Sequence, residues 1–86
     1  MLIVNTPNEL LEQSKKTNNK ITVLDFYADW CGPCKMLTPY LNELNETYKD
    51  KVNFFKVDVD EANELSLQFS IRCMPTLVFL FNDEYL

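Results

Sequence analysis

The chain has no histidine and a single glycine, and both shortages exclude kinds of chemistry. Without histidine, neither a histidine-dependent catalytic triad nor a histidine metal site can form. With Gly32 as its one glycine, the chain cannot build a glycine-rich loop around a phosphate. No flavin, nucleotide or metal motif is present, and we expect no bound cofactor or metal.

Positive charge and long apolar runs are also scarce. Eight Lys and Arg residues against thirteen Asp and Glu residues give a net charge of −5, and no basic cluster occurs. Such a chain is a poor candidate for binding nucleic acid. The longest apolar run, 77–81, is too short to cross a membrane. The N-terminal residues resemble neither a secretory signal nor a transit peptide, so we expect a cytoplasmic protein without a membrane partner.

Length and composition predict one globular domain over residues 1–86. The chain is 47% apolar and 24% charged, which is typical of a folded domain rather than a disordered one. A domain of this size buries only about 60% of its unfolded surface, so its core is marginal. Its three cysteines are fewer than an extracellular disulfide scaffold normally has.

Four segments have the composition of strands: 2–4, 21–27, 52–57 and 76–81. Segment 21–27 is apolar on both faces, which indicates a central strand covered on both sides. Asp25 is the one acidic residue within it.

Helices are predicted between these strands. Thr6 is the expected N-cap of the first helix, with Pro7 at its first position and Glu9 completing a capping box. The second helix is expected from Cys34, where apolar residues recur at helical spacing, and Pro39 should kink it.

A short third helix is expected from Asp60 as its N-cap through Phe69. Strands that alternate with helices in this way indicate an α/β fold with right-handed crossovers.

The chemistry is concentrated in Cys31 and Cys34, which form a C-x-x-C pair between a strand and a helix. A helix N-terminus stabilises a thiolate through its dipole and its free N–H groups. Cys31 could then attack a substrate disulfide, and Cys34 could resolve the mixed disulfide that forms. A zinc site is a weak alternative, because it needs four ligands and the chain offers three cysteines. A purely structural disulfide is the other alternative, although a cytosolic setting argues against it.

Cys34 has to lose a proton for the second step, and Asp25 is the candidate acceptor. Burial raises the pKa of a carboxyl, so Asp25 could accept a proton near neutral pH. Lys56 could be its partner if their strands are neighbours. The plainer interpretations are a strand-end carboxylate that faces water and a lysine that extends to solvent.

The run from Trp30 to Lys35, which follows Asp25-Phe26-Tyr27-Ala28, resembles the thioredoxin family. The similarity continues through 36–39, 57–60 and 74–76, and covers nearly the whole chain. It implies the thioredoxin fold, an α/β fold with a central mixed sheet flanked by helices. It also implies Cys31 as the attacking thiol, Cys34 as the resolving thiol and Asp25 as the buried proton acceptor.

The resemblance assigns roles to the residues around the pair. Gly32 and Pro33 would help to set the redox potential. Trp30 would cover the disulfide, with Asp60 holding its indole N–H.

It also assigns roles to the segment before the last strand. Pro75 would be a cis proline facing the cysteines, and Met74 would offer backbone groups to an extended substrate. Cys73, beside Arg72, matches a third cysteine of some animal thioredoxins. It is expected either to form an intermolecular disulfide or a mixed disulfide with glutathione, or to be a surface thiol without a role.

The chain departs from the family at its C-terminal end. After Phe81 the family continues with a further strand and a closing helix. Here we expect four strands and three helices, without that last strand and helix. An open sheet edge and an exposed apolar patch should result.

The function expected from this resemblance is protein thiol–disulfide exchange. The chain would reduce disulfides of target proteins and be recharged by thioredoxin reductase, with the Cys31–Cys34 disulfide as its only redox group. One alternative is a disulfide oxidase or isomerase, which normally has other residues between the cysteines. Another is a binding module whose surface around Trp30, Pro75 and Cys73 holds a partner.

Overall fold

The computed structural model describes residues 1–16, 19–82 and 84–86. Its elements are β1 (Leu2–Ile3), α1 (Pro7–Lys16), β2 (Ile21–Tyr27), α2 (Gly32–Tyr48), β3 (Val52–Asp58), α3 (Asn63–Gln68), β4 (Thr76–Phe81) and β5 (Glu84–Tyr85).

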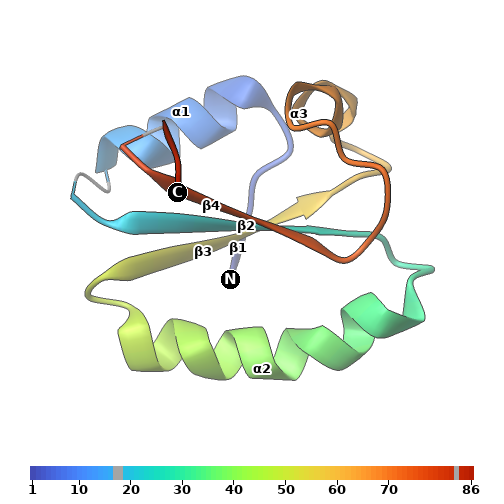
Figure 1. The fold of residues 1–86 in the computed structure, drawn as a ribbon, viewed down its shortest axis with the longest axis horizontal. Helices are drawn as coiled ribbons and strands as arrows, with labels where there is room; N and C mark the ends of the chain where they lie inside the picture. The colour runs from blue at the N-terminus through green and yellow to red at the C-terminus, as the bar shows by residue number, and fades with distance from the viewer. Residues whose placement is uncertain (17–18, 83) are drawn as a thin grey trace.

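The strands form one mixed sheet in the order β1-β3-β2-β4-β5. Strands β1, β3 and β2 are parallel, whereas β4 runs antiparallel to β2 and β5 antiparallel to β4. Figure 1 shows α1 and α3 on one side of the sheet and α2 on the other. The predicted mixed sheet flanked by helices is confirmed, and the central strand is β2, as its two apolar faces indicated.

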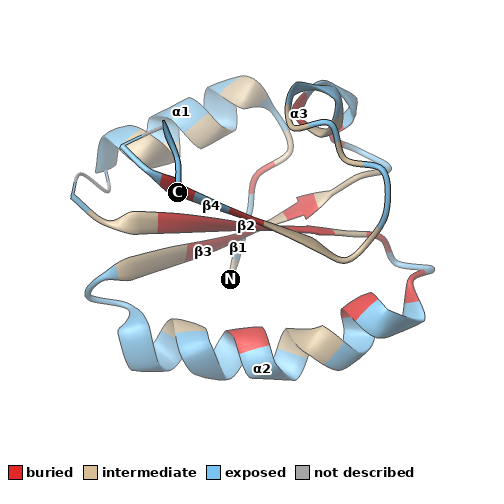
Figure 2. Cartoon of the chain, viewed as in Figure 1, coloured by how far each residue is buried: buried red, intermediate tan, exposed pale blue. Residues whose placement is uncertain are grey.

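The core lies on both sides of β2, as the burial colours of Figure 2 show. Successive side chains of a strand point to opposite faces. Leu24 and Phe26 belong to the larger cluster, on the α1 and α3 side. Val23 packs with Leu41 of α2 and Phe54 of β3 on the other side.

The predicted start of the first helix is confirmed. The Glu9 N–H donates to Thr6 Oγ1 at 3.1 Å, so Thr6 is the N-cap. The Glu9 carboxylate accepts from the Asn5 N–H at 3.2 Å, one residue before the position that a capping box uses. Both bonds hold N–H groups at a helix entrance that the helix itself cannot satisfy.

Two expectations about where helices begin are wrong. Helix α2 begins at Gly32, because Cys31 is its N-cap, rather than at Cys34. Helix α3 begins only at Asn63, and Asp60 does not cap it, because the Asp60 carboxylate accepts a bond from Trp30 instead. Pro39 lies inside α2, as predicted, and the kink stays a prediction.

The expected absence of a fifth strand is also wrong. Phe81 pairs with Glu84 and Leu80 with Tyr85, which adds the short strand β5 beside β4. Asn82 adopts a φ of 49° between the two strands, a conformation that asparagine tolerates better than most residues. The Tyr85 ring then lies edge-on to Phe69, with ring centroids 5.8 Å apart.

The expected exposed apolar patch is confirmed. On β4, Val78 and Leu80 are buried, whereas Phe79 and Phe81 between and beyond them are 46% and 40% exposed. These phenylalanines pair with Val23 and Ile21 of β2 and share the face that α2 covers. Helix α2 therefore reaches Leu77 of β4 but leaves Phe79 and Phe81 uncovered on this face.

No helix in the part of the chain that the structure describes is both long and apolar enough to cross a membrane.

Candidate active site

The two cysteines of the C-x-x-C motif form a disulfide at the N-terminus of α2. Their Cα atoms are 5.3 Å apart, a normal separation for a disulfide. Cys31 is the N-cap of the helix, and its Sγ accepts a hydrogen bond from the Cys34 N–H at 3.2 Å. Both cysteines are buried, and Gly32 and Pro33 between them are exposed. The predicted pairing and its position at a helix entrance are confirmed.

This geometry favours a thiolate on Cys31 once the disulfide is reduced. The Cys34 N–H already points at the Cys31 sulfur, and the positive end of the α2 dipole lies there. Both interactions stabilise a negative sulfur more than a neutral thiol. The site can therefore support nucleophilic sulfur chemistry.

The cysteines sit in apolar surroundings. They form a buried cluster with Ala28, and Tyr27, Val59 and Met74 pack against it. The sequence analysis did not single out Tyr27 or Val59. The signal for Tyr27 was its position at the end of β2, two residues after Asp25 and hence on the same face.

Asp25 lies in the middle of the sheet, only 2% exposed. Its Oδ1 atom has no hydrogen-bond partner among the described residues. Burial raises the pKa of this carboxyl above its ordinary value, and the positive charge of Lys56 opposes the rise. The interpretation as a carboxylate facing water is therefore wrong.

Lys56 is in register with Asp25 on the neighbouring strand β3, as the expected partnership requires. Its ammonium nevertheless forms no ion pair with Asp25. It lies instead over the Tyr27 ring, with Nζ 4.2 Å from the ring centroid. This distance is well within the range of a cation–π contact.

Trp30 and Asp60 are joined as the resemblance implied. The Trp30 indole N–H donates to Asp60 Oδ2 at 3.0 Å. The ring is 67% exposed, so it is part of the surface beside the disulfide. Whether it covers the disulfide stays a prediction.

The Met74–Pro75 peptide bond is cis, as the resemblance implied. Met74 packs against the cysteine cluster, which brings this loop beside the disulfide. Pro75 and Pro33 line a shallow apolar hollow with Met36, Leu37 and Tyr40 of α2. A role for these α2 residues in a surface hollow was not predicted, since Met36 and Leu37 entered through the family resemblance and Tyr40 through its helical spacing.

Cys73 is exposed and is not in a disulfide. It directly precedes Met74, so it lies near the site along the chain. Its carbonyl accepts a bond from the Thr76 hydroxyl, which closes a turn before β4.

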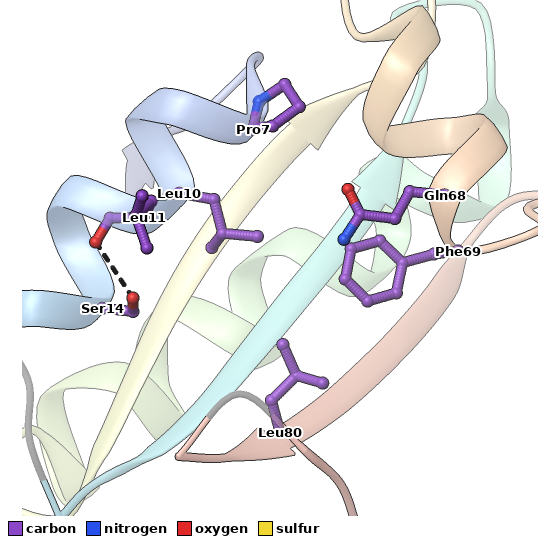
Figure 3. Close-up of a pocket in the computed structure, with 7 residues that line it drawn as sticks. All are labelled: Pro7, Leu10, Leu11, Ser14, Gln68, Phe69 and Leu80. Carbon is purple, nitrogen blue, oxygen red and sulfur yellow. Dashed lines mark hydrogen bonds between the residues drawn. The ribbon is translucent and has the colours of Figure 1, made fainter.

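A cavity on the other side of the sheet is not a second candidate site. Figure 3 shows it between α1, α3 and β4, and its volume is about 160 Å³. Its lining is mainly apolar and carries no charged side chain: Pro7, Leu10, Leu11, Ser14, Gln68, Phe69 and Leu80. The Ser14 hydroxyl donates to the Leu11 carbonyl at 3.0 Å.

Comparison with known proteins places this site in a family. The thioredoxin family model matches residues 2–86. Thioredoxin of Mycoplasmoides gallisepticum is 52% identical over 73 residues, covering 85% of this chain and 70% of that protein. Thioredoxin-T of Drosophila melanogaster is 43% identical over 77 residues, 90% of this chain, although the match spans only about half (49%) of that protein.

Solved structures agree. Fasciola hepatica thioredoxin superposes with a TM-score of 0.94 at 32% identity, covering all of this chain and 82% of that one. The germline-specific thioredoxin Deadhead of Drosophila melanogaster gives the same TM-score at 40% identity and the same coverage. Fold, disulfide and sequence match together show that the chain belongs to the thioredoxin family and carries its redox-active C-x-x-C pair.

Proposed function

We propose that this chain is a protein disulfide reductase that works by thiol–disulfide exchange. The observation that carries the proposal is the Cys31 sulfur at the N-terminus of α2, where it accepts the Cys34 N–H. Membership of the thioredoxin family supports the same chemistry. Residues 1–86 act as one domain in this proposal.

In the first step, the Cys31 thiolate attacks one sulfur of a target disulfide. The target S–S bond breaks, its other sulfur leaves as a thiolate, and a mixed disulfide forms. Trp30, Met74 and Pro75 offer the surface on which the target chain lies. The space beside Gly32 is open to the target, since a Cβ there would meet no atom within 4 Å.

In the second step, Cys34 passes its proton to Asp25 and attacks the Cys31 sulfur. The mixed disulfide breaks, the target leaves as a second thiolate, and the Cys31–Cys34 disulfide forms. Two electrons have then passed to the target. The raised pKa of Asp25, caused by burial, makes it a stronger base than an exposed carboxylate.

The partners of this cycle are disulfide-containing proteins and a thioredoxin reductase that returns two electrons. The Cys31–Cys34 disulfide is the only redox group required, and no metal or cofactor takes part. Gly32, Pro33 and Lys56 tune the reaction. We place this electron transport in the cytoplasm, without nucleic acid or membrane as partner.

Cysteine variants test the proposal on a protein disulfide, with dithiothreitol as electron donor. Cys31→Ser should abolish reduction, and Cys34→Ser should accumulate a mixed disulfide with the target, detectable by mass. Cys73→Ser is the matched control and should keep the parent rate. A Cys31→Ser/Cys34→Ser chain that keeps its biological function would favour a binding module instead. A redox potential of the Cys31–Cys34 pair as high as that of a disulfide oxidase would favour the oxidase or isomerase alternative.

A second proposal concerns Cys73, which is exposed and unpaired. Because it directly precedes Met74, a disulfide between two Cys73 residues would join two chains beside their active sites. Oxidation should give dimers that Cys73→Ser abolishes. Dimers that persist in that variant would contradict the proposal.

A further inference from the structure

Tyr27 has a contact that the proposed exchange reaction leaves unexplained. Its ring lies under the Lys56 ammonium, 4.2 Å from Nζ to the ring centroid. The two residues are not opposite each other in the sheet, since Lys56 is in register with Asp25 and Tyr27 with Asp58. The lysine side chain therefore leans along the strand toward the aromatic ring.

Three facts connect this contact to Asp25. Asp25 and Tyr27 are two residues apart on β2, so their side chains share the face that α2 covers. Lys56 lies beside Asp25 on β3 and is only half-buried. Its ammonium could therefore extend into solvent instead of lying over the ring. Among the described residues Asp25 Oδ1 has no hydrogen-bond partner, so no donor bonded to that oxygen takes the place of the Lys56 charge.

We propose that Tyr27 is a positioning residue, whose ring holds the Lys56 ammonium beside the buried Asp25 carboxyl and so maintains the effect of Lys56 on it. The inference deepens the proposed reductase, since Asp25 is the proton acceptor in that reaction. Tyr27 itself also packs against the cysteine cluster. It therefore links the pair, the lysine and the carboxyl on one face of the sheet.

Among the described residues, Lys56 is the charge that acts on the Asp25 carboxyl. Lys56 acts on Asp25 from β3, and on the β4 side the residue in register with Asp25 is the uncharged Leu77. Helix α2 contributes Cys34, which is in the disulfide. The Tyr27 hydroxyl feels Asp58, Asp29 and Asp25, and burial together with these carboxylates raises its pKa above the usual value. The phenol is consequently harder to ionise than that of an exposed tyrosine.

The test follows the Asp25 carboxyl by NMR in the oxidised chain while pH is varied. Tyr27→Leu removes the ring and lets Lys56 turn to solvent, so the Asp25 titration should move to higher pH. Lys56→Met should move it in the same direction by at least as much. Tyr27→Phe is the matched control, because it keeps the ring face, and should leave the titration where the parent has it.

The double variant Tyr27→Leu/Lys56→Met separates positioning from a merely structural role. If Tyr27 acts through Lys56, the double variant titrates with Lys56→Met and shows no added shift. An added shift, an unchanged Tyr27→Leu or a shift to lower pH would overturn the inference. If Tyr27→Leu does not fold, Lys56→Met in the parent and in Tyr27→Phe still tests whether the lysine acts on Asp25; no shift in either would also overturn it.

This readout needs no turnover. A chain that shows the predicted titrations but reduces no disulfide would keep the inference and contradict the proposed function. A chain that reduces disulfides without the predicted titrations would support the proposed function and contradict the inference about Tyr27.

Discussion

The two faces of the sheet differ in how completely they are closed. On the α1 and α3 side, one continuous cluster joins Val4, which follows β1, to residues of β2, β3, α3 and β4, among them Phe26 and Leu80. On the α2 side, the fully buried residues fall into a small cluster around Leu41 and a second one around the cysteines. Most of the stabilising burial is therefore on one face, and the chemistry is on the other.

The difference shows why the redox pair can be both buried and reactive. We call the face covered by α1 and α3 the closed face. Its core packs against one side of β2, whereas the Asp25 and Tyr27 side chains of β2 lie on the opposite face. That second face holds these polar side chains and the disulfide. Reduction or oxidation of the disulfide there leaves the packing of the larger cluster intact. A reactive site built this way depends on the stability of the face that it does not use.

The largest expected effect contrasts two neighbours on β4. Leu80→Ala enlarges the cavity that this side chain lines on the α1 and α3 face, and should lower the free energy of unfolding by about 2–4 kcal/mol. Phe79→Ala changes a side chain that is 46% exposed and should cost about 1 kcal/mol or less. Urea denaturation of both variants measures the difference. Equal losses of unfolding free energy in the two variants would contradict the assignment of the larger part of the core to the α1 and α3 face.

The second prediction concerns the buried charge on the open face. Asp25 has a raised pKa in the folded chain, so the folded state holds this proton more tightly than the unfolded state does. Stability should therefore fall as pH rises above the ordinary value of 3.8 and through the raised folded value. At neutral pH, Asp25→Asn should be more stable than the parent, by roughly 1–3 kcal/mol.

Thermal unfolding between pH 3 and pH 8 checks this sign. The parent should lose stability relative to Asp25→Asn as pH rises above 3.8, and the two should converge at low pH where both side chains are neutral. Asp58→Asn is the matched control, because Asp58 is half-exposed and ends the neighbouring strand. A parallel pH dependence of parent and Asp25→Asn would contradict the prediction.

The fold was largely predictable, for reasons that differ between elements. Residues 21–27 and 76–81 were identified because β-branched, aromatic and other apolar residues dominate them, with Asp25 as the one charged residue. The start of α1 was identified because its cap is local, from Thr6 to Glu9. Strand β5 was missed because two residues are too few to show a period, and its existence depends on pairing with β4.

The site was predictable where its residues are close in sequence. The roles of Cys31 and Cys34 followed from their spacing and the helix after them. The contact between Lys56 and Tyr27 was not predictable, because it joins different strands and requires the register of the sheet. Asp60 was wrongly expected to cap α3, because the helix begins three residues later, at Asn63. Its bond to the distant Trp30 indole was implied by the family resemblance and not by any local pattern.

A smaller effect is expected where the helices of the two faces begin. Helix α1 has no fully buried residue, so its capping bond matters for its position on the closed face. Thr6→Ala should cost about 1 kcal/mol. Because this cap is an oxygen and not a redox-active sulfur, the loss should be the same in the oxidised and the reduced chain. Denaturation in both redox states measures it, and a loss confined to one state would contradict the separation of the faces.

The smallest stability effect is expected at Gly32, on the open surface between the cysteines. A Cβ there would meet no atom within 4 Å, and the residue does not have positive φ, so Gly32→Ala should change stability by no more than about 0.5 kcal/mol. The added methyl group would nevertheless project where a target chain has to approach. Reduction of a protein disulfide should therefore slow by a larger factor than exchange with small thiols such as dithiothreitol, which reports only the change in redox tuning at Gly32. If both rates fall together, the methyl group acts on the disulfide itself and not on the approach of the target.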